Sequence, residues 1–263
     1  MSALTTPATA LATTAATAID LSIVIPAYNE EQRITPTLER IHRFLSASPW
    51  RYEIVVVDDG SADGTVALVQ RLARTIPQLR VLATSPNRGK GHAVRVGMLA
   101  ARGRVRVMCD ADGSMPPEQL PKLLAPVVRG EVEIAIGSRY ADGALVDTTQ
   151  PLYRRLWSRL CNRVVQRTLV PGIRDTQCGF KAFTADAADD LFRRAQVDGW
   201  AFDLEVLALA RRRCYGIAEV AVEWSDDRRS RVNPLKDMWK VIREAVLIRQ
   251  NLRRGVYGRL APV

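Results

Sequence analysis

The stretch 53-EIVVVDDGS-61 indicates which class of fold the chain adopts. Its apolar residues follow one another with almost no polar alternation, which is typical of a strand buried on both faces of a parallel sheet. Other short apolar runs have the same character, and amphipathic helical patterns separate them. The predicted strands are 21–27, 53–59, 79–84, 104–110 and 132–138, and the predicted helices are Thr35–Leu45, Gly64–Ile76 and Gly91–Ala101. This alternation predicts an α/β fold with a doubly wound, mostly parallel sheet and helices on both faces.

Polar or glycine-rich segments follow the predicted strands. In such sheets ligands bind beyond the carboxyl ends of the strands, so these segments are expected to share one rim and to form the functional site. They are Pro26–Glu30, Asp58–Ser61, Asn87–Gly91, Asp110–Asp112 and Gly137–Arg139. No G-x-G-x-x-G follows the first strand and no G-x-x-x-x-G-K-[ST] occurs, which disfavours dinucleotide and P-loop sites.

Two aspartates, Asp110 and Asp112, stand one residue apart at the end of the strand predicted at 104–110. Their like charges repel, and a divalent cation placed between them and a phosphate would remove that repulsion. Mg²⁺ and Mn²⁺ prefer hard oxygen ligands, and Mg²⁺ commonly takes one or two carboxylates together with substrate phosphates. The pair therefore predicts a metal site that stabilises charge on a leaving diphosphate. The alternative is a solvated loop.

The other strand-end residues each have two interpretations. Asp58 and Asp59 are either turn formers or acceptors of hydrogen bonds from a base or ribose. Glu30 is either an acid favoured at a helix N-terminus or a part of the site. Lys90 is either a solvated loop residue or, with the backbone N–H groups beside it, a ligand of a diphosphate.

Composition argues against several classes of protein. The chain has only two histidines, so neither a Ser-His-Asp hydrolase nor a His-ligated zinc site is expected. Its four cysteines lack metal-ligand spacing, and a reducing cytoplasm is the simplest compartment. No apolar run approaches the ~18–20 residues that span a bilayer. Residues 1–20 are rich in Ala and Thr and are predicted to be a disordered tail rather than a signal peptide.

The whole chain has a net charge of +10, and most of the positive charge lies in its second half. Residues 1–150 hold 16 Lys/Arg against 15 Asp/Glu, a balance of +1, whereas residues 151–263 hold 22 against 13, a balance of +9. This asymmetry predicts a polyanionic partner such as nucleic acid, an anionic membrane or phosphate groups. Nucleic acid is disfavoured because the chain lacks the basic, aromatic-interleaved strands of an RRM and any Cys/His finger.

Two helices are predicted after residue 150. Residues 152–168 form a basic amphipathic helix typical of an interfacial helix, although a core helix with solvated arginines fits the pattern as well. A second helix begins at Asn233-Pro234, an N-cap followed by proline. Its apolar stripe is Leu235, Met238, Trp239, Ile242, Ala245 and Val246. The predicted organisation is thus a tail over 1–20, one large domain over 21–232, and a C-terminal helix and tail over 233–263.

Five motifs in order carry a resemblance to a known family. They are I-V-I-P-A-Y-N-E-E, V-V-V-D-D-G-S, N-x-G-K-G, D-A-D-G and I-G-S-R-Y. Together they resemble the family-2 glycosyltransferases, which have the GT-A fold. Two later segments, 172-GIRDTQCGFKAF-183 and 200-WAFDLEVL-207, are similar to the dolichyl-phosphate β-glucosyltransferase branch, a relative of the dolichyl-phosphate mannose synthases. The similarity covers roughly residues 20–250.

The resemblance implies roles for the matching residues. It implies nucleotide-sugar binding by Pro26, Tyr28, Glu30, Asp58, Asp59, Gly60, Lys90, Asp110, Asp112, Glu205 and Arg231. It implies Mg²⁺ or Mn²⁺ binding by Asp110 and Asp112, and binding of the acceptor phosphate by Arg139, Arg154 and Ser158. The implied catalytic residues are Asp112, Asp203 and Arg139, with Asp203 and Glu205 matching an acidic pair that lines the donor-sugar pocket. Arg174, Asp175, Gln177 and Cys178 match a signature without assigned roles.

The chain departs from the family pattern at two motifs. Mannose synthases usually read D-A-D-L-Q, and Gly113-Ser114 stands here in place of Leu-Gln, which favours the glucosyltransferase branch. Ser230-Arg231 replaces the family's Ser-Lys, and arginine keeps the charge for a diphosphate. Eukaryotic glucosyltransferases of this branch carry an N-terminal membrane anchor that this sequence does not display. Peripheral association with the cytoplasmic face of an anionic membrane is therefore expected.

The implied reaction is transfer of a hexose, with glucose from UDP-glucose as first choice, to a polyprenyl or dolichyl phosphate with inversion. The alternatives are a GDP-mannose-dependent mannose synthase and a GT-A transferase acting on a soluble acceptor. A nucleic-acid-binding protein and a catalytically inactive scaffold are more distant rivals. The sequence indicates no oligomeric state.

Overall fold

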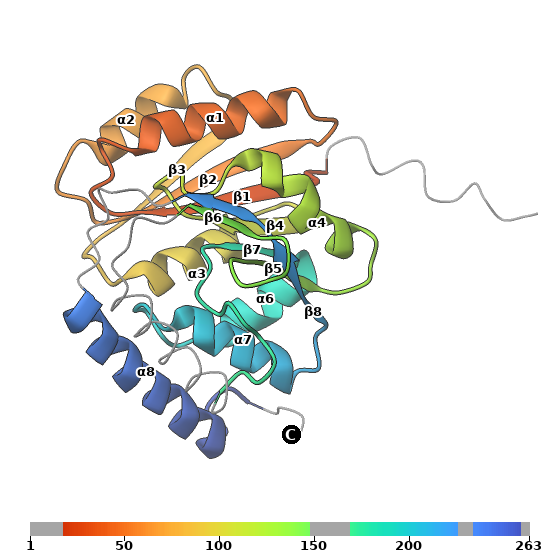
Figure 1. Ribbon diagram of the computed structural model, residues 1–263. Coiled ribbons are helices and arrows are strands. Elements are labelled where there is room, and N and C mark those ends of the chain that lie inside the picture. Colours follow the sequence, from red (N-terminus) through yellow and green to blue (C-terminus); the bar gives the residue numbers. More distant parts are fainter. Residues whose placement is uncertain (1–17, 148–168, 226–233, 259–263) are drawn as a thin grey trace, which may run out of the picture.

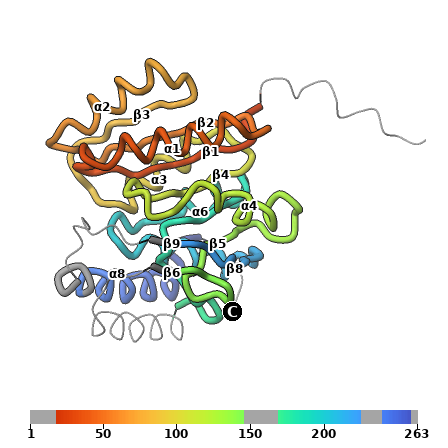
Figure 2. The backbone as a smooth tube through the Cα atoms, turned by 45° about the horizontal axis from the view of Figure 1, so that its top comes forward, coloured from red at the N-terminus to blue at the C-terminus, as the bar shows by residue number. Residues whose placement is uncertain are grey.

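The computed structural model describes residues 18–147, 169–225 and 234–258 of the chain. Seven strands form one sheet in the order β3-β2-β1-β4-β7-β5-β8, and a separate pair, β6 and β9, runs side by side (Figures 1 and 2). The strands are β1 Leu21–Ala27, β2 Tyr52–Asp59, β3 Leu79–Thr84, β4 Val105–Cys109, β5 Ile134–Ser138, β6 Leu145–Asp147, β7 Phe180–Thr184, β8 Ile217–Ala221 and β9 Glu223–Ser225. The helices are α1 Ile34–Ser46, α2 Thr65–Leu72, α3 Lys90–Ala100, α4 Leu120–Val128, α6 Ala185–Arg194, α7 Phe202–Arg212 and α8 Pro234–Arg254, with a 3₁₀ turn at Pro117–Gln119.

The predicted α/β class with a mostly parallel sheet is confirmed. All five predicted strands are present, and two of them, at 21–27 and 79–84, have the predicted bounds. Every residue of β2 is buried, as expected for a strand covered on both faces. The helix predicted at Gly64–Ile76 is shorter, because α2 ends at Leu72 and a turn carries the chain to Ile76.

Strand β7 was not predicted, and it is antiparallel to both of its neighbours, β4 and β5. Its sequence, FKAFT, is short and holds a lysine in place of a continuous apolar run. An antiparallel strand here starts at the edge where the parallel strands end, since Phe180 pairs with Cys109. Residues just before β7 therefore lie at the rim that the parallel strands share.

Helices cover both faces of the sheet (Figure 1). Helices α1, α2 and α4 lie on one face, and α3, α6 and α7 lie on the other, with α8 packed outside α7. Among the described residues, one large core of buried apolar side chains lies between these layers, and a smaller cluster is formed by Val55, Val57 and Ala93. The layers leave the carboxyl edge of the sheet to loops and helix N-termini, which is where the polar residues gather.

The C-terminal helix begins at Pro234, as predicted. It packs inward through Val241, Ala245 and Leu252, and Ile248 is fully buried. Of the predicted stripe, Trp239, Ile242 and Val246 point outward, with Trp239 74% exposed. Among the described residues no helix combines the length and apolarity needed to cross a membrane.

Several predictions fall on residues outside the described ranges. These are the tail over 1–17, the basic helix over 152–168, the domain boundary at 232–233, and the site residues Arg154, Ser158 and Arg231.

Candidate active site

Lys90 and Asp110 form an ion pair at the rim of the sheet. Lys90 is the first residue of α3, Asp110 follows β4, and the Lys90 Nζ lies 2.6 Å from the Asp110 Oδ1. Burial acts to lower the pKa of Lys90, but the charges of Asp110 and Asp203 outweigh it and raise that pKa, so the ammonium stays protonated. Gly179, just before β7, is required here because a Cβ at this position would overlap the Asp110 carboxylate.

Asp112 lies in the turn that follows β4. Its Oδ1 accepts a hydrogen bond from the backbone N–H of Ser114 at 2.9 Å, and Gly113 between them has φ +72°. The hydroxyl of Thr37 on α1 donates to the carbonyl of Ala111, which ties this turn to the helix. Burial and the charge of Asp110 together raise the pKa of Asp112. The fold thus holds the Asp110 carboxylate close enough to oppose the ionisation of Asp112.

A second ion pair lies beneath the first. Lys181, in the middle of β7, is 1% exposed, and its Nζ donates to the Asp203 Oδ1 and to the carbonyl of Cys178, both at 2.6 Å. Asp203 lies in the first turn of α7, where the helix dipole favours negative charge. Burial raises the pKa of Asp203, and the ammonium groups of Lys181 and Lys90 only partly offset this. Asp203 therefore belongs to the same charged cluster as Asp110, and its predicted catalytic role stays a prediction.

The donor set of this cluster fits a hard divalent cation. Three carboxylates, Asp110, Asp112 and Asp203, face two ammonium groups, Lys90 and Lys181, so full ionisation leaves an excess of one negative charge. Within the ranges that the structure describes, no three potential metal-ligating side chains converge on one point. Such an incomplete set suits Mg²⁺ or Mn²⁺, which take remaining ligands from substrate phosphates and water.

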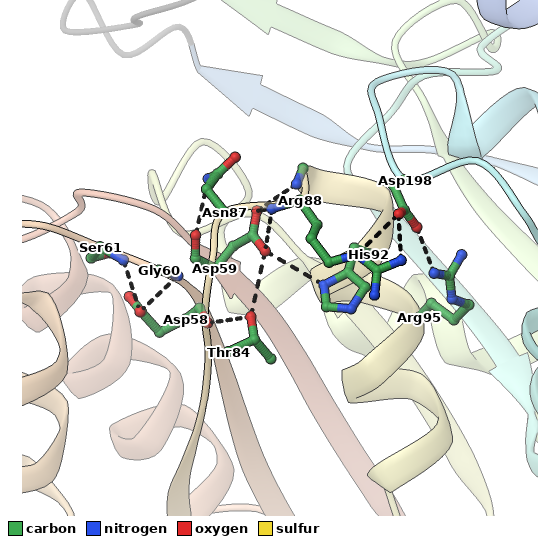
Figure 3. A network of polar contacts seen from close by, with 11 residues as sticks. Asp58, Asp59, Gly60, Ser61, Thr84, Asn87, Arg88, His92, Arg95 and Asp198 are labelled. Carbon is green, nitrogen blue, oxygen red and sulfur yellow. Dashed lines mark hydrogen bonds and ion pairs between the residues drawn. The ribbon is translucent and has the colours of Figure 1, made fainter.

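Asp59 at the end of β2 organises the turn that leads into α3 (Figure 3). Its carboxylate accepts backbone hydrogen bonds from Arg88 at 3.1 Å and from Gly89 at 2.6 Å, and its carbonyl accepts one from the Asn87 side chain. The ring Nδ1 of His92 lies 3.5 Å from the same carboxylate. The described contacts of Asp59 order the turn that carries Lys90, and its predicted contact with the nucleotide stays a prediction.

Asp58 is bonded on one side only. Its Oδ2 accepts from the backbone N–H groups of Gly60 at 3.1 Å and Ser61 at 3.0 Å (Figure 3). Its Oδ1 is buried, and no residue in the described ranges forms a hydrogen bond with it. Gly60 has φ +76°, and a Cβ there would come within 2.9 Å of the Asn87 backbone nitrogen. The Oδ1 thus lacks a partner among the described residues, and the predicted contact of Asp58 with a base or ribose stays a prediction.

The segment after β1 is partly committed to internal contacts. Both carboxylate oxygens of Glu30 pair with Arg33, at 2.5 and 2.7 Å, just before α1. Tyr28 is 47% exposed at the rim, and Pro26 is buried within β1. Tyr28 is therefore available to a ligand, whereas Glu30 serves the helix end.

Arg139 follows β5 and is held in place by Asp175. Its Nε and Nη2 donate to the two carboxylate oxygens at 2.8 and 2.9 Å, and its backbone N–H donates as well. The guanidinium lies 5.4 Å from the centroid of the Trp224 ring. Burial acts to lower the pKa of Arg139, but the charge and hydrogen bonds of Asp175 outweigh it and raise that pKa. Arg139 in turn lowers the pKa of Asp175, although burial acts to raise it. Asp175 of the unassigned signature thus acquires a role as the partner that orients Arg139.

Glu205 lies apart from Asp203 despite the short sequence spacing. It is fully buried, its Oε2 accepts from the backbone N–H groups of Gln196 and Val197 at 2.9 Å, and its Oε1 accepts from the Tyr257 hydroxyl at 2.7 Å. These contacts order the loop between α6 and α7. The predicted direct contact of Glu205 with the donor sugar stays a prediction.

Sequence reasoning missed Lys181, Gly179 and the role of Asp175. A lysine inside F-K-A-F was the available signal, because a charge within a buried strand needs a partner of opposite charge. Nothing in the sequence pairs Lys181 with Asp203 or Asp175 with Arg139, since each pair forms across separate elements.

Known proteins resemble this chain over most of its length. The model of the family "Glycosyl transferase family 2" matches residues 22–192. The chain is 35% identical over 251 residues to the dolichyl-phosphate beta-glucosyltransferase of Dictyostelium discoideum, with 91% of this chain and 76% of that protein covered. It is 39% identical over 243 residues to the protein of the same name from Drosophila melanogaster, with 88% and 74% covered.

A solved structure shares the fold. Glucosyl-3-phosphoglycerate synthase from Mycobacterium tuberculosis, crystallised with Mn²⁺ and UDP-glucose, superposes with a TM-score of 0.65 at 20% identity, with 88% of this chain and 79% of that one covered. Sequence motifs, sheet order and relatives lead to one conclusion: the chain belongs to glycosyl transferase family 2.

Proposed function

We propose that this chain transfers glucose from UDP-glucose to a polyprenyl phosphate of the dolichyl phosphate type, with inversion, to give a β-linked lipid-phosphate sugar. The assignment of the acceptor and of the sugar rests on the similarity to curated dolichyl-phosphate beta-glucosyltransferases over about nine-tenths of the chain. UDP as the nucleotide is supported by the neighbour crystallised with Mn²⁺ and UDP-glucose.

The charges of the site suit an acceptor that arrives ionised. A phosphate monoester has a second pKa near ~6, so it is largely dianionic at neutral pH and needs no strong general base. A site poor in histidine and rich in paired acids and lysines is consistent with this chemistry. The main task of the protein is then to bring two anionic substrates together and to align them.

Each group of the site takes a part in that task. Lys90 would bind the donor diphosphate, Asp58 the base or ribose, and Arg139 the acceptor phosphate, with Asp175 fixing the guanidinium. Asp110 and Asp112 would hold Mg²⁺ or Mn²⁺, which when bound stabilises negative charge on a departing diphosphate. Asp203, oriented by Lys181, would face the donor sugar.

The proposal includes peripheral association with the cytoplasmic face of an anionic membrane. Support comes from α8, whose outward side exposes Trp239, Ile242 and Val246 beside Lys240 and Arg243. An exposed tryptophan among aliphatic and basic residues is the composition of a helix that lies in a lipid interface. Sedimentation with phosphatidylserine vesicles and with phosphatidylcholine vesicles tests this. Equal binding to both, or to neither, would refute it.

The reaction itself is tested by incubating the purified chain with Mg²⁺ or Mn²⁺, polyprenyl phosphate in detergent and a radiolabelled sugar nucleotide. We expect label from UDP-glucose to enter the organic phase, and EDTA to prevent it. Label from GDP-mannose alone would make the protein a mannose synthase. Transfer only to soluble phosphorylated acceptors would refute the lipid assignment.

A further inference from the structure

The loop over residues 195–201, between α6 and α7, packs directly on the turn that carries Lys90, and we call it the support loop. A Cβ at Gly89 would come within 2.5 Å of the Asp198 carbonyl oxygen, and a Cβ at Gly91 within 2.5 Å of the Val197 carbonyl oxygen. The backbone N–H of His92 donates to the Asp198 carbonyl at 3.1 Å. The two backbones are thus in contact, and a shift of the support loop must move the turn.

Side chains reinforce this contact (Figure 3). The Asp198 carboxylate pairs with Arg88 at 2.8 Å and with Arg95 at 2.5 Å, one on the turn and one on α3. Trp200 of the support loop places its ring 5.5 Å from the Lys90 ammonium, within cation–π range. The support loop therefore holds the backbone that precedes Lys90 and also places the Trp200 ring beside the Lys90 ammonium.

The support loop is itself anchored from the C-terminal helix. The Glu244 Oε2 on α8 accepts a hydrogen bond from the backbone N–H of Ala201 at 2.8 Å. A Cβ at Gly199 would overlap the Glu244 carboxylate, so glycine at 199 permits this close approach. A cavity of about 750 Å³ lies beside this contact, bounded by the turn, the support loop and Lys240, Arg243 and Glu244 of α8. The Glu244 carboxylate lines this cavity and bonds to the support loop beside it.

We propose that Glu244 is a positioning residue for the nucleotide-sugar site: it holds the support loop, and thereby Lys90 and Trp200, in the geometry that binds the donor diphosphate. This inference rests on the proposed function, because it takes Lys90 as a ligand of the donor. It also makes α8 a part of the donor site through one carboxylate, although the helix itself lies outside the sheet layers.

The test compares Glu244→Ala, Glu244→Gln and, as a matched control, Glu39→Ala on the exposed side of α1. Glutamine keeps an oxygen that accepts from the Ala201 N–H, whereas alanine does not. We expect Glu244→Ala to raise the Kd for UDP-glucose, measured by calorimetry with Mn²⁺, and the KM for the donor by about tenfold with kcat changed less than about threefold. We expect Glu244→Gln to stay within about threefold of the wild type, and Glu39→Ala to match it.

Amide hydrogen exchange of the same variants reports on the loop without any ligand. Glu244→Ala should speed exchange in peptides covering 196–202 and 87–92, with other segments unchanged. Wild-type donor affinity and exchange in Glu244→Ala would overturn the inference, as would a loss spread over the whole protein that Glu244→Gln fails to restore. A wild-type chain that binds no UDP-glucose would instead refute the proposed function, while exchange would still decide whether Glu244 holds the loop.

Discussion

Two pairs of aspartates end two strands of the same sheet, and the fold treats them differently. At the end of β2, Asp59 accepts backbone hydrogen bonds from Arg88 and Gly89, and Asp58 accepts them on one oxygen. At the end of β4, Asp110 and Asp112 lie half-buried, and the charge of Asp110 raises the pKa of Asp112. The first pair is largely satisfied by the protein. The charge of the second pair is balanced in part by Lys90, and the rest of that balance is left to a bound cation.

The difference separates Asp59, whose contacts are structural, from the β4 pair, which we propose acts on a ligand. Asp59 accepts its hydrogen bonds from backbone N–H groups of the protein itself, so it serves the turn of Lys90 whether or not a ligand is present. Asp112 has one backbone partner and one negative neighbour, which favours recruitment of a cation. Similar D-D and D-x-D motifs thus have different consequences because of the groups that meet them in space.

The largest effect is expected for Asp112→Asn. Asparagine keeps the oxygen that accepts from the Ser114 N–H, so the turn should persist while the charge is lost. Sugar transfer should fall by about 10²- to 10³-fold, because stabilisation of the leaving diphosphate is reduced. Initial rates at saturating Mn²⁺, with circular dichroism as the check on folding, measure this. Activity within about threefold of the wild type would contradict the assignment.

A smaller effect, on stability, is expected for Asp59→Ala. Removal of this carboxylate leaves the N–H groups of Arg88 and Gly89 without their acceptor, at a cost of about 1–3 kcal/mol in the free energy of unfolding. Urea denaturation measures the change. The control is Asp142→Ala, a fully exposed aspartate for which a change below ~0.5 kcal/mol is expected. Equal stability of the two variants would show that Asp59 does not organise the turn.

The second pair should behave oppositely in the absence of metal. Burial and Asp110 raise the pKa of Asp112, so between its unfolded and folded pKa values the folded chain binds more protons than the unfolded chain. Its contribution therefore lowers stability as pH rises through this range. Asp112→Asn should be more stable than the wild type at neutral pH with EDTA, by roughly 0.5–2 kcal/mol. The difference in the free energy of unfolding between the variant and the wild type should become smaller as the pH falls. A difference that grows at low pH would contradict a raised pKa for Asp112.

The smallest effect is expected for Asp58→Asn. The amide oxygen of asparagine can still accept hydrogen bonds from the backbone N–H groups of Gly60 and Ser61, so the free energy of unfolding should change little. The amide nitrogen takes the place of the Asp58 Oδ1, so that acceptor is lost. Affinity for UDP should fall about five- to tenfold, the value of one hydrogen bond. Calorimetry with UDP and with inorganic pyrophosphate separates the base and ribose contact from the diphosphate contact. A loss of equal size for pyrophosphate would place Asp58 at the diphosphate instead.

Much of this fold is predictable from sequence because its strands are short apolar runs that end in polar turns. Strand β2 needs only its own residues to indicate burial on both faces, and the rule for parallel sheets then gathers the strand ends at one rim. Strand β7 escaped prediction because its five residues are too few for periodicity and include Lys181. The aspartates at the ends of β2 and β4 were found by their position after strands, whereas Asp203 was named from the family resemblance. The contacts of Lys181 with Asp203, of Asp175 with Arg139 and of Glu244 with Ala201 were not predicted, since each joins distant segments that meet only in three dimensions.

The most direct test of the central claim is an electron paramagnetic resonance titration of Mn²⁺ into the wild type and into Asp112→Asn, each with and without UDP. We expect weak Mn²⁺ binding to the wild type alone, binding tightened at least about tenfold by UDP, and loss of this coupling in the variant. Mn²⁺ affinity that is unaffected by UDP, or coupling that is equally strong in Asp112→Asn, would contradict a metal site shared by the β4 aspartates and the donor diphosphate.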